Sequence, residues 1–212
     1  EIKRYDDKLI FSDLSFEVHK GDRIAILGDN ATGKTTILKC INGLTDFESG
    51  EIRFGANVTV GYYDQEQHGL TESNTIFSEL HDAYPFLTET KVRNTLAAFM
   101  FTEDDVFKRI SDLSGGERGR VSLAKLMLSK SNLLILDEPT NHLDMDTKQM
   151  LEEALREYDG TLLYVSHDRY FVNQTANTIL ELSDGGLTKY LGNYDDYIAK
   201  KEQISFCINS AV

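Results

Sequence analysis

Short apolar runs alternate with amphipathic stretches along most of the chain. Apolar strands are predicted at residues 23–27, 133–136 and 161–165. Helical spacing of apolar positions marks residues 36–41, the stretch from Gly116 to Leu128, and residues 150–158. This alternation of strand and helix predicts an α/β fold with a mostly parallel sheet.

Other strand signals predict antiparallel pairs. Leu14, Phe16 and Val18 alternate with polar residues within 9–18, and a hairpin turn is expected at Asp6–Asp7. Further short strands are predicted at 50–54 and 58–63, and residues 177–182 and 187–191 flank a glycine turn as a closing hairpin. An antiparallel opening of the chain and an antiparallel closing hairpin are therefore expected.

A helical segment is expected at about residues 71–115. A third short helix within it is predicted from Thr102, because Thr102 and Asp105 have the spacing of a capping box. A last helix is predicted over about 194–204. The apolar stripes of the two longer inserted helices are Ile76, Phe77 and Leu80, and then Val92, Leu96, Phe99 and Met100.

Composition limits the function classes. With 212 residues, 41% of them hydrophobic, the chain suits a single α/β domain covering 1–212. The formal charge of −13 opposes strong binding of free nucleic acid by the surface as a whole. The two cysteines, Cys40 and Cys207, form no C-x-x-C motif, which favours a reducing cytoplasm over a disulfide or zinc scaffold. No apolar run approaches the length of a membrane span, so direct membrane insertion is not expected. Because the chain opens on Glu1 close to a predicted strand, we expect an excised fragment.

One stretch between the strand at 23–27 and the helix at 36–41 matches the P-loop pattern G-x-x-x-x-G-K-[ST]. A glycine turn without a ligand is the alternative, but strand, glycine loop and helix together are what phosphate binding requires. Loop amides and the helix N-terminus would surround phosphates, and Lys34 would add a cation. Thr35 would offer its hydroxyl to Mg²⁺. The expected ATP-binding residues are Gly28, Asp29, Asn30, Ala31, Thr32, Gly33, Lys34, Thr35 and Thr36.

Other polar clusters follow predicted strands or begin helices. Asp137 and Glu138 come after the strand at 133–136, and His167 follows the strand at 161–165. A carboxylate pair could instead be a helix cap, and His167 could be a buried structural histidine. Ser114, Gly115 and Gly116 open a helix and form a second anion site by the same physics as the P-loop.

Taken in order, the P-loop, Gln65, Leu113-Ser114-Gly115-Gly116-Glu117, the run ending in Asp137-Glu138, and His167 resemble the nucleotide-binding domain of the ATP-binding cassette (ABC) superfamily. The resemblance spans Tyr5 to about Leu191. It implies a P-loop core, an antiparallel β subdomain and an inserted helical subdomain. Ala31 departs from the family, which usually has glycine at that position.

The resemblance also implies roles for these residues. Glu138 orients or deprotonates the attacking water, His167 contacts the γ-phosphate, and Gln65 completes the water or metal shell. Mg²⁺ is held by Thr35, Gln65 and, through water, Asp137, while Tyr5 stacks on adenine. Because such cassettes pair head to tail, Ser114, Gly115 and Gly116 contact ATP on the partner cassette, and Asp144 lines the shared interface.

A finer resemblance concerns the segments 137–144, 166–171 and Gly192-Asn193-Tyr194-x-x-Tyr197, which look like the second cassette of the ABC-F subfamily. Members of that subfamily carry two cassettes on one soluble chain and act on the ribosome. The resemblance implies a second cassette as partner and ribosome binding through regions missing here. Two other hypotheses remain: the ATPase subunit of a membrane transporter, and an ATP-gated clamp without useful turnover, which the intact Glu138 and His167 disfavour.

Overall fold

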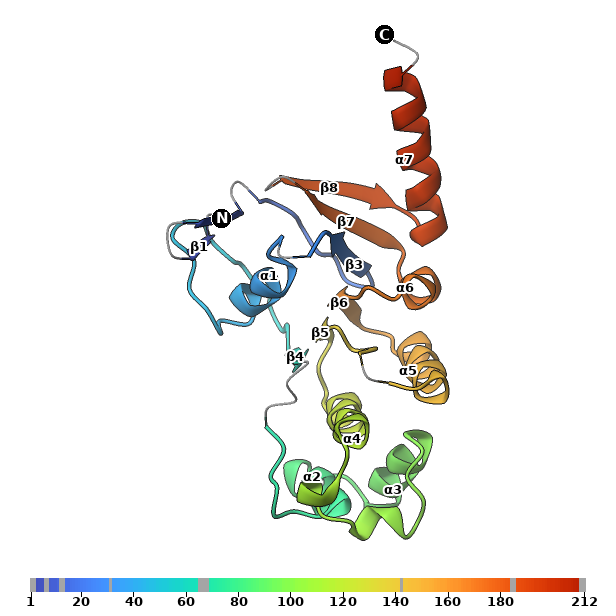
Figure 1. Cartoon of the computed structure of the whole chain (residues 1–212). Helices are drawn as coiled ribbons and strands as arrows, with labels where there is room; N and C mark the ends of the chain where they lie inside the picture. The colour runs from blue at the N-terminus through green and yellow to red at the C-terminus, as the bar shows by residue number, and fades with distance from the viewer. Residues whose placement is uncertain are drawn as a thin grey trace. The chain divides into compact units, whose positions relative to one another are not determined.

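The computed structural model describes residues 3–5, 8–11, 14–30, 32–64, 69–141, 143–183 and 186–209 (Figure 1). The chain forms two compact units, one made of 1–56 and 160–212 and the other of 57–159. The prediction that residues 1–212 form a single ATP-binding domain stays a prediction. Each unit is described by itself below.

The first unit is built on four neighbouring strands. Strand β3 (Arg23–Gly28) pairs in parallel with β6 (Thr161–Val165) on one side and with β7 (Thr178–Ser183) on the other. Strand β8 (Gly186–Leu191) continues antiparallel to β7, which confirms the predicted closing hairpin. Every side chain of β6 is buried, as expected for an apolar strand covered on both faces.

Within the described residues of this unit, three helices are present. Helix α1 (Lys34–Ile41) follows the glycine loop as predicted. Helix α7 (Tyr194–Asn209) begins where expected and continues past the predicted end. Helix α6 (Arg169–Thr175) is not predicted by the sequence analysis, because it is only seven residues long, too short to display a periodic apolar stripe.

Two strand predictions in this unit need correction. Strand β2 (Lys8–Phe11) pairs antiparallel with β1 (Lys3–Tyr5), but the chain from 14 to 19 forms no strand. Residues 50–54 also form none, and Phe54 is 49% exposed. Alternating apolar residues make a strand only where a partner pairs with their backbone, and no pairing is found for these stretches within the described residues. The Asp6–Asp7 turn lies outside the described residues.

The second unit pairs β4 (Val60–Tyr63) in parallel with β5 (Leu133–Asp137), so the strand predicted at 58–63 starts two residues late. Helix α4 (Gly115–Leu128) contacts β4, and α5 (Met145–Glu157) follows β5. Both helices were predicted. Because β4 and β5 run in parallel, the polar residues after each strand lie at the same edge of this pair.

The predicted helical segment forms α2 (Ile76–Ala83) and α3 (Glu89–Ala98), which contact each other and α4. Two short 3₁₀ helices follow, η1 (Asp105–Phe107) and η2 (Ile110–Asp112). The third helix predicted at Thr102 is only the η1 turn, although Thr102 and Asp105 do exchange the predicted hydrogen bonds. Met100 was predicted on the apolar stripe, but it lies beyond the end of α3 with φ of 64° and is 44% exposed.

A buried ion pair connects two helices of the second unit. Lys125 on α4 donates to Glu79 on α2 over 2.6 Å, and the Glu79 side chain is only 2% exposed. The other carboxylate oxygen of Glu79 accepts from the Thr71 amide and the Asn74 side chain. Burial of this carboxylate is therefore compensated by three donors.

We predict that Lys125→Met destabilises the protein by about 3 kcal/mol, because it leaves a buried carboxylate without its counter-ion. The double variant Glu79→Leu/Lys125→Met should recover most of this loss. Lys108→Met is the matched control, since Lys108 pairs with Asp105 at the exposed surface, and it should change stability by less than about 1 kcal/mol. Urea unfolding followed by circular dichroism measures all three, and equal losses for Lys125→Met and Lys108→Met would contradict the prediction.

Candidate nucleotide-binding site

The loop between β3 and α1 has the backbone that phosphate binding requires. Strand β3 ends at Gly28, with φ of 152°, and Gly33 has φ of 95° at the N-cap of α1. Asp29 and Asn30 are exposed, and Thr32 donates through its hydroxyl to the carbonyl of Asp29 over 2.9 Å. Thr35 is exposed and Thr36 half-buried at the first turn of α1. Ala31 lies outside the described residues.

Gly28 is required by a close approach of two strands. It pairs with Leu182 on β7, and a Cβ atom added to Gly28 would overlap the carbonyl oxygen of Leu182. Any other residue would push β7 away or turn the loop aside. The first glycine of the motif is thus fixed by packing as well as by its backbone angle.

Lys34 lies within the loop rather than extending into solvent. Its exposed fraction is 7%, and its ammonium group donates to the carbonyl oxygens of Gly28 over 2.8 Å and Asp29 over 2.7 Å. The loop therefore carries a positive charge held at its rim. A phosphate chain placed there would meet a preformed cation.

The N-terminus of α1 differs from those of the next five α-helices. Gly33 makes no side-chain cap, and the first turn contains no acidic residue. Helices α2 to α6 are each capped by a side-chain oxygen, from Thr75, Thr88, Ser114, Asp144 and Asp168 in that order. An N-terminus without such an oxygen offers its amides and positive dipole end to an external anion.

His167 lies beside this loop in the same unit. Strands β3 and β6 run in parallel with Ile26 opposite Val165, so the chain leaving β6 reaches the end of the sheet where Gly28 begins the loop. His167 is exposed, which excludes the buried structural histidine considered from the sequence. It is followed by Asp168, the N-cap of α6.

The carboxylate pair lies in the second unit, at the end of β5. Asp137 is 3% exposed and Glu138 is 7% exposed. Glu138 has φ of 48°, a left-handed conformation that costs a residue with a side chain roughly 1–2 kcal/mol. Such strain persists where the surroundings hold it, and it is concentrated at functional sites. This conformation has no signature in the local sequence pattern, because it depends on how the chain leaves the buried strand.

Gln65 lies outside the described residues, but the strand leading to it is defined. Tyr63, the last residue of β4, pairs with Leu136 on β5. The segment that continues to Gln65 therefore leaves the sheet beside the segment that carries Asp137 and Glu138. The side chain of Tyr5 is also outside the described part, and the predicted contact of Tyr5 with adenine stays a prediction.

The second glycine turn begins α4 as predicted, and its residues are also helix caps. Ser114 and Glu117 form a capping box, in which the Ser114 hydroxyl donates to Glu117 over 2.8 Å and accepts from its amide. Hydrogen bonds from the amide and hydroxyl of Ser114 lower the pKa of Glu117. A Cβ on Gly115 would meet nothing within 4 Å, so packing within the chain does not explain this glycine. Gly116, the next residue in the first turn of α4, is half-buried.

Asp144 is the N-cap of α5 and accepts from the Thr147 amide over 2.8 Å. Hydrogen bonds from Thr147 lower the pKa of Asp144, and the charge of Arg120 contributes. Arg120 also contributes to the lowered pKa of Glu117, after the bonds from Ser114. Sequence reasoning missed Arg120, whose guanidinium lies over the Phe101 ring at 4.8 Å and within electrostatic reach of both caps.

The structure thus brings the P-loop and His167 together in one unit, and Asp137, Glu138, Ser114 and Asp144 into the other. Among the residues described, no three His, Cys, Asp or Glu side chains form a group that could hold a metal ion. Mg²⁺ in phosphate sites needs no such group, because a hydroxyl, one carboxylate, water and phosphate oxygens complete its shell. The Thr35 hydroxyl in the first unit and the Asp137 carboxylate in the second are each a ligand type that suits that chemistry.

The family model described as ABC transporter matches residues 11–141, which include the P-loop, the Ser114 turn and the carboxylate pair. The chain belongs to the ABC transporter family. It is therefore an ABC ATP-binding cassette, as the sequence predicted. The search for membrane spans, made over the described residues, found no helix both long and apolar enough to cross a bilayer.

Curated relatives of this cassette include ABC-F proteins. It is 51% identical over 194 residues to YdiF of Bacillus subtilis, covering 92% of this chain and 30% of YdiF. It is 40% identical to ABC transporter F family member 5 of Arabidopsis thaliana, covering 92% of this chain and 29% of the relative. It is 38% identical to the energy-dependent translational throttle protein EttA of Escherichia coli, covering 95% of this chain and 37% of EttA. The cassette thus spans about a third of each relative.

Solved structures support the fold. A dimeric bacterial ABC transporter cassette matches with a TM-score of 0.77 at 18% identity, covering 90% of this chain and 95% of that one. The ATP-binding subunit of an ABC transporter matches with a TM-score of 0.78 at 23% identity, covering 90% of this chain and 87% of that one. The predicted ABC ATPase fold, with its mostly parallel α/β sheet, is confirmed.

We predict that Lys34→Ala lowers the affinity for MgATP at least tenfold, because it removes the ammonium group held at the rim of the loop. Unfolding free energy should fall by only about 1–2 kcal/mol, since the carbonyls of Gly28 and Asp29 lose one donor. Lys39→Ala, at the other end of α1, is the matched control and should bind MgATP normally. Titration calorimetry measures the affinities, and an unchanged affinity for Lys34→Ala would remove the P-loop from the proposed site.

Proposed function

We propose that this cassette binds and hydrolyses ATP, pairs head to tail with a second cassette around the nucleotide, and serves as half of an ABC-F factor that acts on the ribosome. The observation that carries the proposal is its identity of 38–51% to YdiF and EttA over more than nine-tenths of its length. The cassette supplies the ATP-driven switch. Ribosome contacts belong to parts of the whole protein outside this chain.

ATP binding follows from the P-loop. The phosphates would lie against the N-terminus of α1, where the first turn contains no acidic residue and no side-chain cap occupies the amides. Lys34 would neutralise phosphate charge from the rim, and the exposed Thr35 hydroxyl would face Mg²⁺. Tyr5 would stack on the adenine ring. Bound Mg²⁺ supplies charge neutralisation of the phosphates during transfer.

Hydrolysis needs a positioned water and little covalent chemistry from the protein. Glu138 would orient that water or accept its proton. Its left-handed backbone would give the carboxylate a different direction from the one it would have at the end of a relaxed strand. Asp137 and Gln65 would complete the water and metal shell. His167, exposed at the end of β6, would donate to the γ-phosphate and stabilise it as charge develops.

Head-to-tail pairing explains the second anion loop. The Ser114 turn begins a helix, and among the described residues no atom lies within 4 Å of a Cβ placed on Gly115. The turn formed by Ser114, Gly115 and Gly116 would contact the γ-phosphate of ATP held by the partner cassette, while the Ser114 amide itself donates to Glu117. Asp144 would line the shared interface, with the charge of Arg120 within electrostatic reach of both Asp144 and Glu117. A related solved cassette is dimeric.

The ribosomal role rests on the relatives. EttA is named an energy-dependent translational throttle protein, and two plant relatives are named members of the ABC transporter F family. The charge of −13 disfavours a broad contact of this cassette with ribosomal RNA. ATP would instead close two cassettes and fix the direction of connecting segments that reach the ribosome.

The ATPase subunit of a membrane transporter is the second candidate function. Its support is the likeness to transporter cassettes of known structure, at 18% and 23% identity. The ABC-F relatives are about twice as similar in sequence over a comparable length. The sequence similarity therefore favours the ABC-F role, and the fold likeness does not distinguish the two.

We predict that Glu138→Gln retains MgATP affinity, loses at least 90% of turnover (a change of more than about 1.4 kcal/mol in the barrier) and accumulates an ATP-bound dimer. The amide keeps the shape of the side chain and loses its charge and basicity. Gel filtration with and without MgATP detects the dimer, and wild-type activity per molecule should rise with protein concentration. Glu157→Gln, at the end of α5, is the control with the same chemical change. Turnover at the wild-type rate would exclude Glu138 as the catalytic carboxylate.

We predict that the whole protein carrying this cassette sediments with ribosomes in an ATP-dependent manner, while the isolated cassette binds them weakly. The Glu138→Gln form of the whole protein should stay on ribosomes longest, because it cannot reopen by hydrolysis. Pelleting through a sucrose cushion with ATP or ADP, at two salt concentrations, tests this. Failure to sediment in every nucleotide state, together with association with a membrane subunit, would favour the transporter role.

A further inference from the structure

The segment Gly192-Asn193-Tyr194-x-x-Tyr197 has no role in the mechanism above, yet the structure gives each of its named residues a defined task. Gly192 has φ of 115°, and a Cβ there would overlap the side chain of Asp196. Asn193 and Asp196 exchange two hydrogen bonds, from the Asn193 amide over 3.0 Å and the Asp196 amide over 3.1 Å. These contacts set where α7 begins and in which direction it leaves β8.

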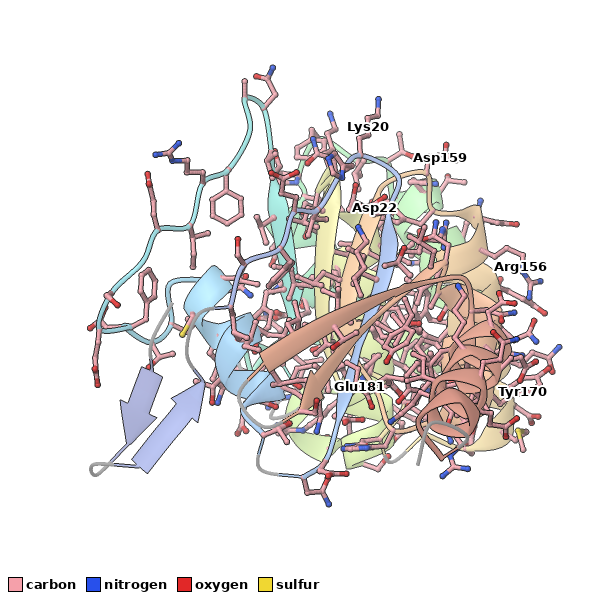
Figure 2. All side chains as sticks on the ribbon, turned by 90° about the horizontal axis from the view of Figure 1, so that it is seen from above. Lys20, Asp22, Arg156, Asp159, Tyr170 and Glu181 are labelled. Carbon is pink, nitrogen blue, oxygen red and sulfur yellow. The ribbon has the colours of Figure 1, made fainter. Side chains whose placement is uncertain are left out.

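The first connection of α7 is to strand β7. Tyr197 and Lys201, one turn apart on α7, both donate to the same oxygen of Glu181, over 2.7 Å and 2.5 Å. The Tyr197 ring also packs edge-on against Tyr190 of β8, with ring centroids 5.0 Å apart. Burial and the hydrogen bond to Glu181 raise the pKa of Tyr197 to about 12, so its hydroxyl keeps its proton at neutral pH. Figure 2 labels Glu181 on its strand.

Glu181 lies opposite the strand residue that immediately precedes the P-loop. Leu27 of β3 pairs with Glu181, and Gly28 pairs with Leu182, the next residue. The Leu182 carbonyl is the group that a side chain at position 28 would strike. A shift of β7 that moved Glu181 would therefore also move the wall against which the first glycine of the P-loop is packed.

The second connection of α7 is to helix α6. Asn173 on α6 donates to the Asp195 carboxylate over 2.8 Å and accepts from the Asp195 amide over 3.1 Å. Arg169, the first residue of α6, lies over the Tyr194 ring at 6.0 Å. Helix α6 begins two residues after His167 and is capped by Asp168. The opening turns of α7 are thus bonded both to the strand behind the P-loop and to the helix that follows His167.

We propose that α7 couples the two nucleotide-contacting elements of this unit, with Tyr197 and Asp195 as positioning residues that report the relative placement of the P-loop and the His167 segment. The inference rests on the proposed function, because it takes ATP to be the ligand that draws both elements together. When ATP is bound, β7 and α6 are held in one arrangement, and both connections to α7 are satisfied together.

The chemistry of these connections makes them sensitive to small shifts. They are directional hydrogen bonds and an edge-on ring contact rather than a broad apolar face, and hydrogen bonds weaken steeply with misalignment. A helix anchored at two separately moving points responds to their relative displacement as one body. By reciprocity, anything that holds α7 in its anchored position would raise the affinity for ATP by the factor with which ATP stabilises that position.

Hydrogen–deuterium exchange on the whole chain tests the coupling. The amides of residues 197–203 should exchange about 5-fold more slowly with MgATP than without nucleotide, and MgADP should have a smaller effect, because it lacks the γ-phosphate that reaches His167. Titration calorimetry on the same sample measures whether MgATP binds. The calorimetry distinguishes a failure of the proposed function, in which MgATP does not bind, from a failure of the coupling, in which MgATP binds and the exchange of α7 does not change.

Two variants each remove one connection. Tyr197→Phe removes the hydroxyl and keeps the ring, and Asn173→Ala removes both bonds to Asp195 at a half-buried position. Each should weaken MgATP binding by about 5-fold and reduce the nucleotide response of α7. Tyr170→Phe is the matched control, since Tyr170 lies on the same helix α6 and is 66% exposed. Figure 2 labels this residue. It should change neither quantity.

Each outcome of these experiments supports or overturns a stated proposal. Slower exchange of α7 with MgATP, reduced in both variants and intact in the control, supports the coupling. MgATP binding without any change in α7 exchange overturns the coupling and leaves the proposed function standing. A loss of thermal stability in Tyr197→Phe with unchanged MgATP affinity shows a purely structural role and also overturns it. Absence of MgATP binding to the wild-type chain overturns both proposals.

Discussion

At Gly28 the backbone of β3 passes so close to the Leu182 carbonyl on β7 that no side chain fits between them. The phosphate loop departs from this point, so its direction is set by the pairing of β3 with β7 on one side and β6 on the other. A buried strand in the middle of a parallel sheet moves little, because its backbone groups are bonded on both edges. The loop and the residue after β6 are therefore placed by the same ladder of hydrogen bonds.

The N-termini of the described helices differ in whether a side-chain oxygen caps their first amides. Five helices satisfy their first amides with Ser, Thr or Asp side chains, whereas α1 begins at a glycine without such a cap. The Ser114 turn combines both properties, since its hydroxyl completes a capping box while Gly115 keeps the surface open. A capped helix loses little stability if an anion approaches its open glycine. This combination suits a contact made only when a partner cassette arrives.

Glu79 and Glu138 are both buried carboxylates, but their surroundings differ. Glu79 is surrounded by three donors, including Lys125, and its burial is compensated within the fold. Glu138 is also buried, but on a backbone held in a left-handed conformation. A protein tolerates strain of about 1–2 kcal/mol at one residue when the surrounding strand and helix leave it no alternative. The left-handed backbone therefore distinguishes Glu138 from Glu79.

The sequence by itself determined the elements whose signal is local. The P-loop between a strand and a helix, the glycine turn opening α4, the buried strand before Asp137 and the closing hairpin follow from short-range spacing and glycine chemistry, and the structure confirms each element. Only the tertiary structure decided which alternating stretches found a strand partner, so that residues 50–54 form none. It also decided the left-handed backbone of Glu138, the exposure of His167, and the anchoring of α7 to Glu181 and Asn173. These depend on contacts between residues distant in the chain, and a local pattern carries no information about which distant groups will meet.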